Sequence, residues 1–160
     1  MNIRMANIKD LDKITDVEAK CFPKAEAASK ESFEKRLTVY SNHFWLLEDG
    51  EKLVGFVNGM VTDEDILRDE MYDNAKLHNE QGQWQMIFGV GIIPEYRRQG
   101  FAEKILNRVI DEAREEGRKG LVLTCKDKLV HYYAKFGFKD EGISESTHGN
   151  AVWHDMRLVF

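Results

Sequence analysis

An apolar run that passes through a short basic turn into an amphipathic helix constrains this fold more than any other stretch. The run is WQMIFGVGII (residues 84–93). It lacks polar alternation, which predicts a central strand buried on both faces. The segment EKILNRVIDEAREEG (residues 103–117) then predicts a helix whose apolar stripe is Ile105, Leu106, Val109, Ile110 and Ala113. GLVLTC (residues 120–125) follows as a strand, so we expect a right-handed parallel crossover across this unit.

The remaining elements predict an α+β fold with a mixed, mostly antiparallel central sheet and flanking helices. We expect a strand at residues 2–5, helices within 7–22 and 29–40 capped by Asn7 and Ser29, and a hairpin over 43–61 that turns at Asp49-Gly50. A partly helical connection over 62–82, a short helix over 128–136 and two strands within 138–160 complete the order. No linker or repeat interrupts the chain, which predicts one domain over 1–160.

Charge and cysteine content exclude several classes of function. The formal charge is -5 at pH 7, which argues against a nucleic-acid partner, because phosphate binding needs an excess of Lys and Arg. The 2 cysteines do not make a disulfide framework, the N-terminus lacks the apolar stretch of a signal peptide, and no apolar run is long enough for a membrane span. We therefore expect a cytoplasmic protein with no membrane partner; the sequence leaves a monomer and a homodimer both open.

The basic turn IIPEYRRQGFA (residues 92–102) places Arg97 and Arg98 at the start of a helix. Positive charge is unfavourable there, because a helix N-terminus already carries partial positive charge and unpaired N–H groups. An anion between these groups reverses the sign, and Gly100 would let backbone approach it closely. Phosphate suits this geometry, although neither a P-loop nor a dinucleotide fingerprint is present. A surface turn with both arginines in solvent is the alternative.

The same residues resemble a known family. VGIIPEYRRQGFAEKIL looks like motif A of the GNAT-type N-acetyltransferases, with Arg97, Gly100 and Ala102 at the Arg/Gln-x-x-Gly-x-Gly/Ala positions. LVLTCKDKLVHYYAKFGF is similar to the C-terminal motif of the arylalkylamine (serotonin) N-acetyltransferases, and CFPKAEAAS resembles the substrate loop of that group. The resemblance implies a GNAT-like fold and direct transfer of acetyl from acetyl-CoA to a primary amine.

The resemblance also implies where acetyl-CoA binds. The pyrophosphate would lie on the turn, and the pantetheine arm would pair with backbone beside Val90 and Ile92, where an N–H would also polarise the thioester carbonyl. The residues of the turn that are carried over as cofactor-binding are Arg97, Arg98, Gln99, Gly100, Phe101 and Ala102.

For catalysis, the resemblance places Tyr133 where the family keeps the tyrosine that protonates the departing sulfur. Packing on the apolar side of its helix is the alternative role for this side chain. The positions of the paired histidines of the serotonin enzymes are Met86 and Phe88 here, and neither can take a proton. The matching base is Glu26 in the N-terminal loop, for which an exposed structural carboxylate is the alternative.

Other chemistry is less well supported by the residue pattern. Cys125 lacks a recognisable His/Asp partnership, which disfavours an acetyl-cysteine intermediate. The 5 histidines show no metal-ligand spacing, so no metal is expected. The acceptor predicted is a small amine, such as an arylalkylamine or a polyamine. A protein N-terminus or lysine acetyltransferase and a catalytically silent acyl-CoA-binding module stay open.

Overall fold

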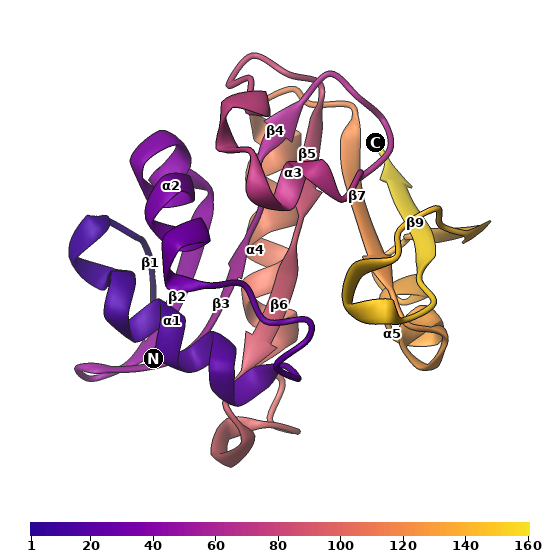
Figure 1. The fold of residues 1–160 in the computed structure, drawn as a ribbon. Helices are drawn as coiled ribbons and strands as arrows, with labels where there is room; N and C mark the ends of the chain where they lie inside the picture. Colours follow the sequence, from indigo (N-terminus) through magenta and orange to yellow (C-terminus); the bar gives the residue numbers. More distant parts are fainter. The chain divides into compact units, whose positions relative to one another are not determined.

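The computed structural model describes residues 1–160, which form two compact units (Figure 1). The first unit contains Met1–Gly59 and Gly89–Val109, and the second contains Met60–Phe88 and Ile110–Phe160. Each unit has its own sheet, and each is described separately. None of the helices has both the length and the apolar character that a membrane span requires. The single domain over 1–160 stays a prediction.

The first unit is built on an antiparallel sheet with the order β1-β2-β3-β6. Its strands are β1 (Asn2–Met5), β2 (Phe44–Asp49), β3 (Lys52–Asn58) and β6 (Gly89–Ile92). β2 and β3 form the predicted hairpin, and Gly50 lies at its turn with φ +62, a left-handed conformation that glycine adopts without steric cost. β1 is the edge strand that the sequence predicts. The opposite edge is β6.

Helices α1 (Leu11–Cys21) and α2 (Lys30–Tyr40) complete the first unit and cover the sheet on one side (Figure 1). Both predicted caps are present: Asn7 accepts from the Lys9 N–H ahead of a 3-10 turn that leads into α1, and Ser29 accepts from the Ser32 N–H. The apolar residues at helical spacing are buried, namely Leu11, Ile14 and Val17 of α1 and Phe33, Leu37 and Tyr40 of α2. The Phe33 ring of α2 meets the rings of Phe44 and Phe56 in the sheet. The 3.6-residue spacing therefore identified the core-facing side of each helix.

The second unit is built on a mixed sheet with the order β4-β5-β7-β9-β8. Its strands are β4 (Val61–Thr62), β5 (Trp84–Ile87), β7 (Gly120–Cys125), β8 (Lys139–Ile143) and β9 (His154–Val159). β5 and β7 are parallel, as the crossover prediction requires, and the other pairs are antiparallel. The predicted α+β class, mostly antiparallel with flanking helices, is confirmed.

Helical segments connect these strands. α4 (Phe101–Glu115) continues from the first unit into the second, and its predicted stripe is buried along its whole length. α3 (Glu70–Asp73) and α5 (Val130–Ala134) are short, as are the 3-10 turns Ile8–Asp10, Ser41–His43, Ala75–Leu77, Pro94–Tyr96, Asp127–Leu129 and His148–Asn150. The partly helical connection over 62–82 is thus confirmed, and Gly117 follows the end of α4 with φ +77.

The structure corrects three element predictions. The run 84–93 is not one central strand, because it breaks at Phe88 into β5 and β6, which belong to different sheets. The hairpin ends at Asn58, and Val61 pairs with β5 instead. Within the range 138–160 predicted as two strands, Trp153 lies outside both, because it precedes β9, and it is half-buried. Burial on both sides of the break kept the sequence apolar, so periodicity alone could not reveal it.

Candidate acyl-CoA site and catalytic residues

β6 is an edge strand of its sheet, and some of its backbone hydrogen-bonding groups point away from the neighbouring strand β3. Ile93 N–H donates to the Val54 carbonyl at 2.9 Å, which marks that pair as hydrogen-bonded. Pairs alternate along an antiparallel ladder, so the N–H and C=O groups of Val90 and Ile92 point away from β3. An extended ligand with amide groups could therefore pair with the N–H and C=O of Val90 and with the N–H of Ile92, as an added strand would. The Ile92 carbonyl already accepts from Arg97 Nε.

Two glycines of β6 allow the C-terminal end of α1 to pack closely against the strand. A Cβ on Gly91 would lie 3.2 Å from Cys21 Sγ, and one on Gly89 would lie 3.6 Å from the Phe22 ring. The C-terminal end of α1 therefore packs directly against β6. The loop that carries Glu26 starts from this contact, and it is held by the Ala28 N–H, which donates to Glu18 Oε2 at 2.9 Å.

The turn between β6 and α4 has the backbone geometry of an anion-binding loop. Arg98 has φ +62 and Gly100 has φ +81, both in the left-handed region. The Gly100 carbonyl accepts from the Lys104 N–H at 3.2 Å, which makes Gly100 the N-cap of α4. The amides of Phe101 and Ala102 then have no partner within the helix, and glycine supplies no side chain to cap them. Such amides favour a bound phosphate.

The two arginines of the turn differ in position. Arg97 Nε donates to the Ile92 carbonyl at 2.8 Å, so its side chain folds back onto β6. Arg98 is exposed and forms no ion pair. Burial raises the pKa of the Cys21 thiol, and a hydrogen bond from Arg97 opposes that effect. Arg97 thus connects the turn to β6 through a side-chain hydrogen bond. The exposed side chain of Arg98 is the more available of the two to bind an anion.

Tyr133 lies on α5 in the second unit and is only 8% exposed. Its ring meets Tyr132 and Phe138 edge-on. Burial, with smaller contributions from Tyr132 and Cys125, raises the pKa of Tyr133 well above the ordinary tyrosine value. The phenol therefore keeps its proton at neutral and mildly alkaline pH, as a proton donor must. The same burial and ring contacts also fit the alternative role, in which Tyr133 is a packing residue.

Several other residues that the sequence singled out have structural surroundings. Burial, with help from Asp140 and Asp127, raises the pKa of the Cys125 thiol to about 11, so the thiol is neutral and a poor nucleophile. Met86 is fully buried. The neighbouring Gln85 Nε2 donates to the Met60 and Met86 carbonyls at 3.3 and 2.8 Å, so its amide is bonded to backbone.

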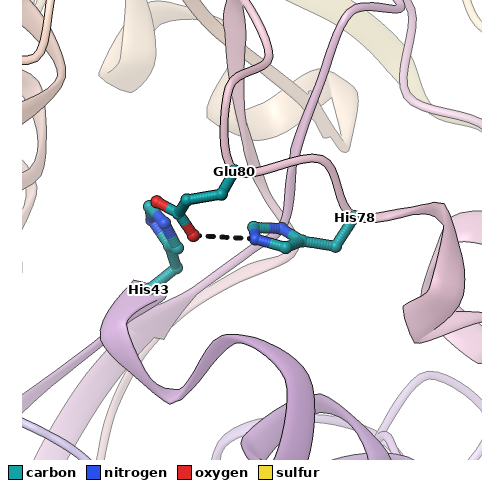
Figure 2. A group of neighbouring side chains, drawn as sticks. All are labelled: His43, His78 and Glu80. Carbon is teal, nitrogen blue, oxygen red and sulfur yellow. Dashed lines mark hydrogen bonds and ion pairs between the residues drawn. The ribbon is translucent and has the colours of Figure 1, made fainter.

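His78 forms hydrogen bonds through both of its ring nitrogens. Its Nδ1 accepts from the Val61 N–H at 3.0 Å, so its Nε2 carries the proton. Nε2 then donates to Glu80 Oε1 at 2.9 Å, the contact drawn as a dashed line in Figure 2. Both ring nitrogens stabilise the connection between β4 and β5. His131, on α5, is exposed.

Of the predicted site residues, the first unit holds Glu26, Val90, Ile92 and the turn 97–102, and the second holds Tyr133. Sequence reasoning missed the backbone role of Arg97.

The edge strand β6 and the N-terminus of α4 that follows it together suit a ligand that is extended and carries phosphate. Residues 11–138 match the model of the Acetyltransferase (GNAT) family, and the chain belongs to this family. The GNAT resemblance is thereby confirmed, and the arylalkylamine group within it stays a prediction.

Individual relatives are distant. Over 104 residues, 63% of this chain and 40% of the relative, the chain is 29% identical to N-acetyltransferase 8 of Homo sapiens. Over 111 residues, 69% of this chain and 52% of the relative, it is 28% identical to serotonin N-acetyltransferase of Mesocricetus auratus. The matched regions thus span only about half or less of these relatives.

Among solved structures, the GphF GNAT-like decarboxylase in complex with isobutyryl-CoA superposes with a TM-score of 0.85 at 21% identity, covering 99% of both chains. At that identity the likeness shows the fold.

Proposed function

We propose that the chain transfers an acetyl group from acetyl-CoA to a small primary amine, such as an arylalkylamine or a polyamine. The observation that carries this proposal is that two features follow one another in the chain: the backbone groups of β6 that point away from β3, and the left-handed turn ahead of α4. The two features suit the two ends of one cosubstrate: amides of a pantetheine arm at the strand edge, and a pyrophosphate at the helix N-terminus.

The residues of the turn divide this binding among them. The amides from Arg98 to Ala102 hold the pyrophosphate, with Gly100 allowing close approach and Arg98 adding charge. Gln99 and Phe101 contribute backbone within the same turn. Arg97 preserves its shape through the bond to the Ile92 carbonyl. The Val90 N–H, at the open edge, is the donor that polarises the thioester carbonyl.

Acetyl-CoA, when bound, supplies an acetyl group on a thioester that a neutral amine can attack directly. A C–N bond forms as the C–S bond breaks. Tyr133 gives its proton to the departing sulfur, and Glu26 takes the proton that the amine loses. Support for Tyr133 comes from its burial and raised pKa. Support for Glu26 comes from its loop, which begins where α1 meets β6.

A thermal-shift experiment with a matched pair of glycine variants tests the cofactor site. Gly100 and Gly117 lie at the two ends of α4, with φ +81 and φ +77, and a Cβ at either would meet nothing within 4 Å. Leucine at either position should therefore cost a similar ~1–2 kcal/mol of backbone strain without a clash. Saturating coenzyme A at about 100 Kd should stabilise the wild type by ~2.7 kcal/mol, which is roughly 5–10 °C.

We expect Gly117→Leu to keep this shift and Gly100→Leu to lose it. A shift that survives in Gly100→Leu would refute the assignment of the turn. Thiol release from acetyl-CoA with aromatic amines, polyamines and peptides then separates the acceptor classes. Turnover of peptides alone would favour a protein acetyltransferase. A coenzyme A shift with no turnover of any acceptor would favour the silent binding module.

A further inference from the structure

A buried carboxylate interrupts the apolar stripe of α1. Leu11, Ile14, residue 18 and Cys21 recur at the spacing of one helix face, but residue 18 is a glutamate. Glu18 is only 7% exposed. Acidic side chains are rarely buried to this extent, because the loss of their hydration costs free energy. Local rules of this kind are broken mainly where a specific contact or a function requires it, so we expect Glu18 to do more than fill space.

The Glu18 carboxylate holds the loop that follows α1. The Ala28 N–H donates to Glu18 Oε2 at 2.9 Å, which joins residues 10 positions apart in the chain. This bond connects the last turn of α1 to the far end of the loop, immediately before Ser29, the N-cap of α2. A backbone N–H bonded to a carboxylate is a strong contact among protein hydrogen bonds, so it fixes where the loop ends.

The loop is also bonded within itself. The Pro23 carbonyl accepts from the N–H groups of Glu26 and Ala27, each at 2.9 Å. Lys24 and Ala25 are exposed, whereas Glu26 is half-buried. The loop is therefore a compact turn, and Glu26 lies on its less exposed side.

The start of the loop packs against β6. A Cβ on Gly91 would lie 3.3 Å from the Phe22 ring, and one on Gly89 would lie 3.6 Å from it. Both glycines belong to the strand that is proposed to hold the pantetheine arm, and all of these residues belong to the first unit. The loop is thus fixed at both ends, at its start by packing on β6 and at its end by Glu18.

We propose that Glu18 is a positioning residue, whose carboxylate holds the loop 22–29 in the shape that presents Glu26 to the acceptor amine. The inference rests on the acetyltransferase function proposed above, and it gives a buried residue of α1 a role in the use of the acceptor rather than in cofactor binding. Glu18 transfers no proton in this scheme. It accepts one backbone N–H, and Glu26 is the group that takes the proton from the amine.

Two substitutions of similar length separate the hydrogen bond from packing. Glu18→Gln keeps an oxygen that can accept from the Ala28 N–H, whereas Glu18→Met suits the apolar stripe and lacks that oxygen. Asp16→Met is the matched control, because it replaces an exposed carboxylate of the same helix. Hydrogen exchange at the Ala28 amide, followed by NMR without any ligand, reports on the loop directly. We expect exchange at least about tenfold faster in Glu18→Met and within about twofold of the wild type in the other two variants.

Turnover then tests whether the fixed loop matters to the reaction. Thiol release from acetyl-CoA is measured with 2-phenylethylamine and with spermidine as acceptors. In Glu18→Met, kcat/KM for the amine should fall at least about tenfold, while KM for acetyl-CoA and the coenzyme A thermal shift stay unchanged. Glu18→Gln should restore kcat/KM. A residue with only a packing role would not show this split, because methionine packs in the stripe at least as well as glutamine.

Unchanged exchange at Ala28 in Glu18→Met would overturn the inference. Equal losses of turnover in the methionine and glutamine variants would also overturn it, since the charge rather than the hydrogen bond would then be needed. If Glu18→Met does not fold, Ala28→Pro removes the donor N–H from the loop and leaves α1 intact. That variant should show the same loss of kcat/KM, and full turnover in it would contradict the positioning role.

The inference and the proposed function fail in different ways. Faster exchange in Glu18→Met with normal turnover would overturn the positioning role alone. Faster exchange in that variant, together with no turnover of any amine by the wild type, would refute the acetyltransferase function and the role in it, while the hydrogen bond from Ala28 to Glu18 would stand.

Discussion

Replacing Tyr133 with phenylalanine isolates the proton that the departing sulfur needs. The substitution deletes one hydroxyl from a side chain that is 8% exposed and leaves its ring contacts with Tyr132 and Phe138 in place. Burial and neighbouring charges, with no hydrogen bond, set the pKa of this phenol. The stability change should therefore stay within ~1 kcal/mol, since no bonded partner is abandoned.

The effect on catalysis should be far larger than the effect on stability. General acid catalysis contributes ~100-fold or more to a transfer of this kind, so kcat of Tyr133→Phe should fall about 100-fold, which corresponds to ~2.7 kcal/mol of transition-state stabilisation. Because burial raises the pKa, the wild-type kcat should not decline as the pH approaches 10.0, the ordinary tyrosine value. The assay is thiol release at saturating amine, with the coenzyme A thermal shift measured on the same samples.

Tyr132→Phe provides the control, because it removes a hydroxyl from the adjacent half-buried residue of the same helix. It should leave kcat near the wild-type value. If Tyr133→Phe turns over as fast as Tyr132→Phe, the tyrosine is a packing residue and another group or water protonates sulfur. If the coenzyme A shift disappears in Tyr133→Phe, a loss of kcat would no longer report on proton transfer.

Two further substitutions test stability and an alternative mechanism. Arg4 Nη2 lies 2.6 Å from Oδ1 of the buried Asp10, and hydrogen bonding from Arg4 lowers the pKa of this carboxyl below 3.8. Asp10→Asn should therefore lower the free energy of unfolding by ~1–2 kcal/mol at pH 7, or Tm by roughly 2–8 °C. That stability is present above pH 3.8 and is lost as the pH falls through the lowered value, so melting curves from pH 7 to 3 should converge for the two proteins, and parallel curves would contradict the assignment. Cys125→Ala should keep kcat essentially unchanged in the thiol-release assay, because a thiol with a pKa of about 11 is not a nucleophile at neutral pH; a collapse of kcat with an intact fold would revive the acetyl-cysteine route.

The sequence predicted helices and paired strands well wherever one periodicity ran unbroken. The stripe of α4 and the caps Asn7 and Ser29 follow from local rules, which act within a few residues. The break at Phe88 could not be predicted in this way, because β5 and β6 are both apolar and differ only in their distant partners, β7 and β3. Pairing between segments far apart in sequence leaves no periodic signal within either one.

The candidate site divides along the same line. The turn after β6 was predicted because a glycine and two arginines at a helix start have a local physical meaning. The inward turn of Arg97 was not, since its acceptor is a backbone carbonyl that every residue possesses.

Membership of the family says more about the proposed cosubstrate site than about the acceptor. The proposed cosubstrate contacts come from backbone: two left-handed residues, an uncapped helix and the edge of β6. Backbone geometry survives extensive substitution, which is consistent with a TM-score of 0.85 at 21% identity. Acceptor contacts must come from side chains, which are free to change at that identity. The amine is therefore better sought in the side chains of this chain than in the names of its relatives.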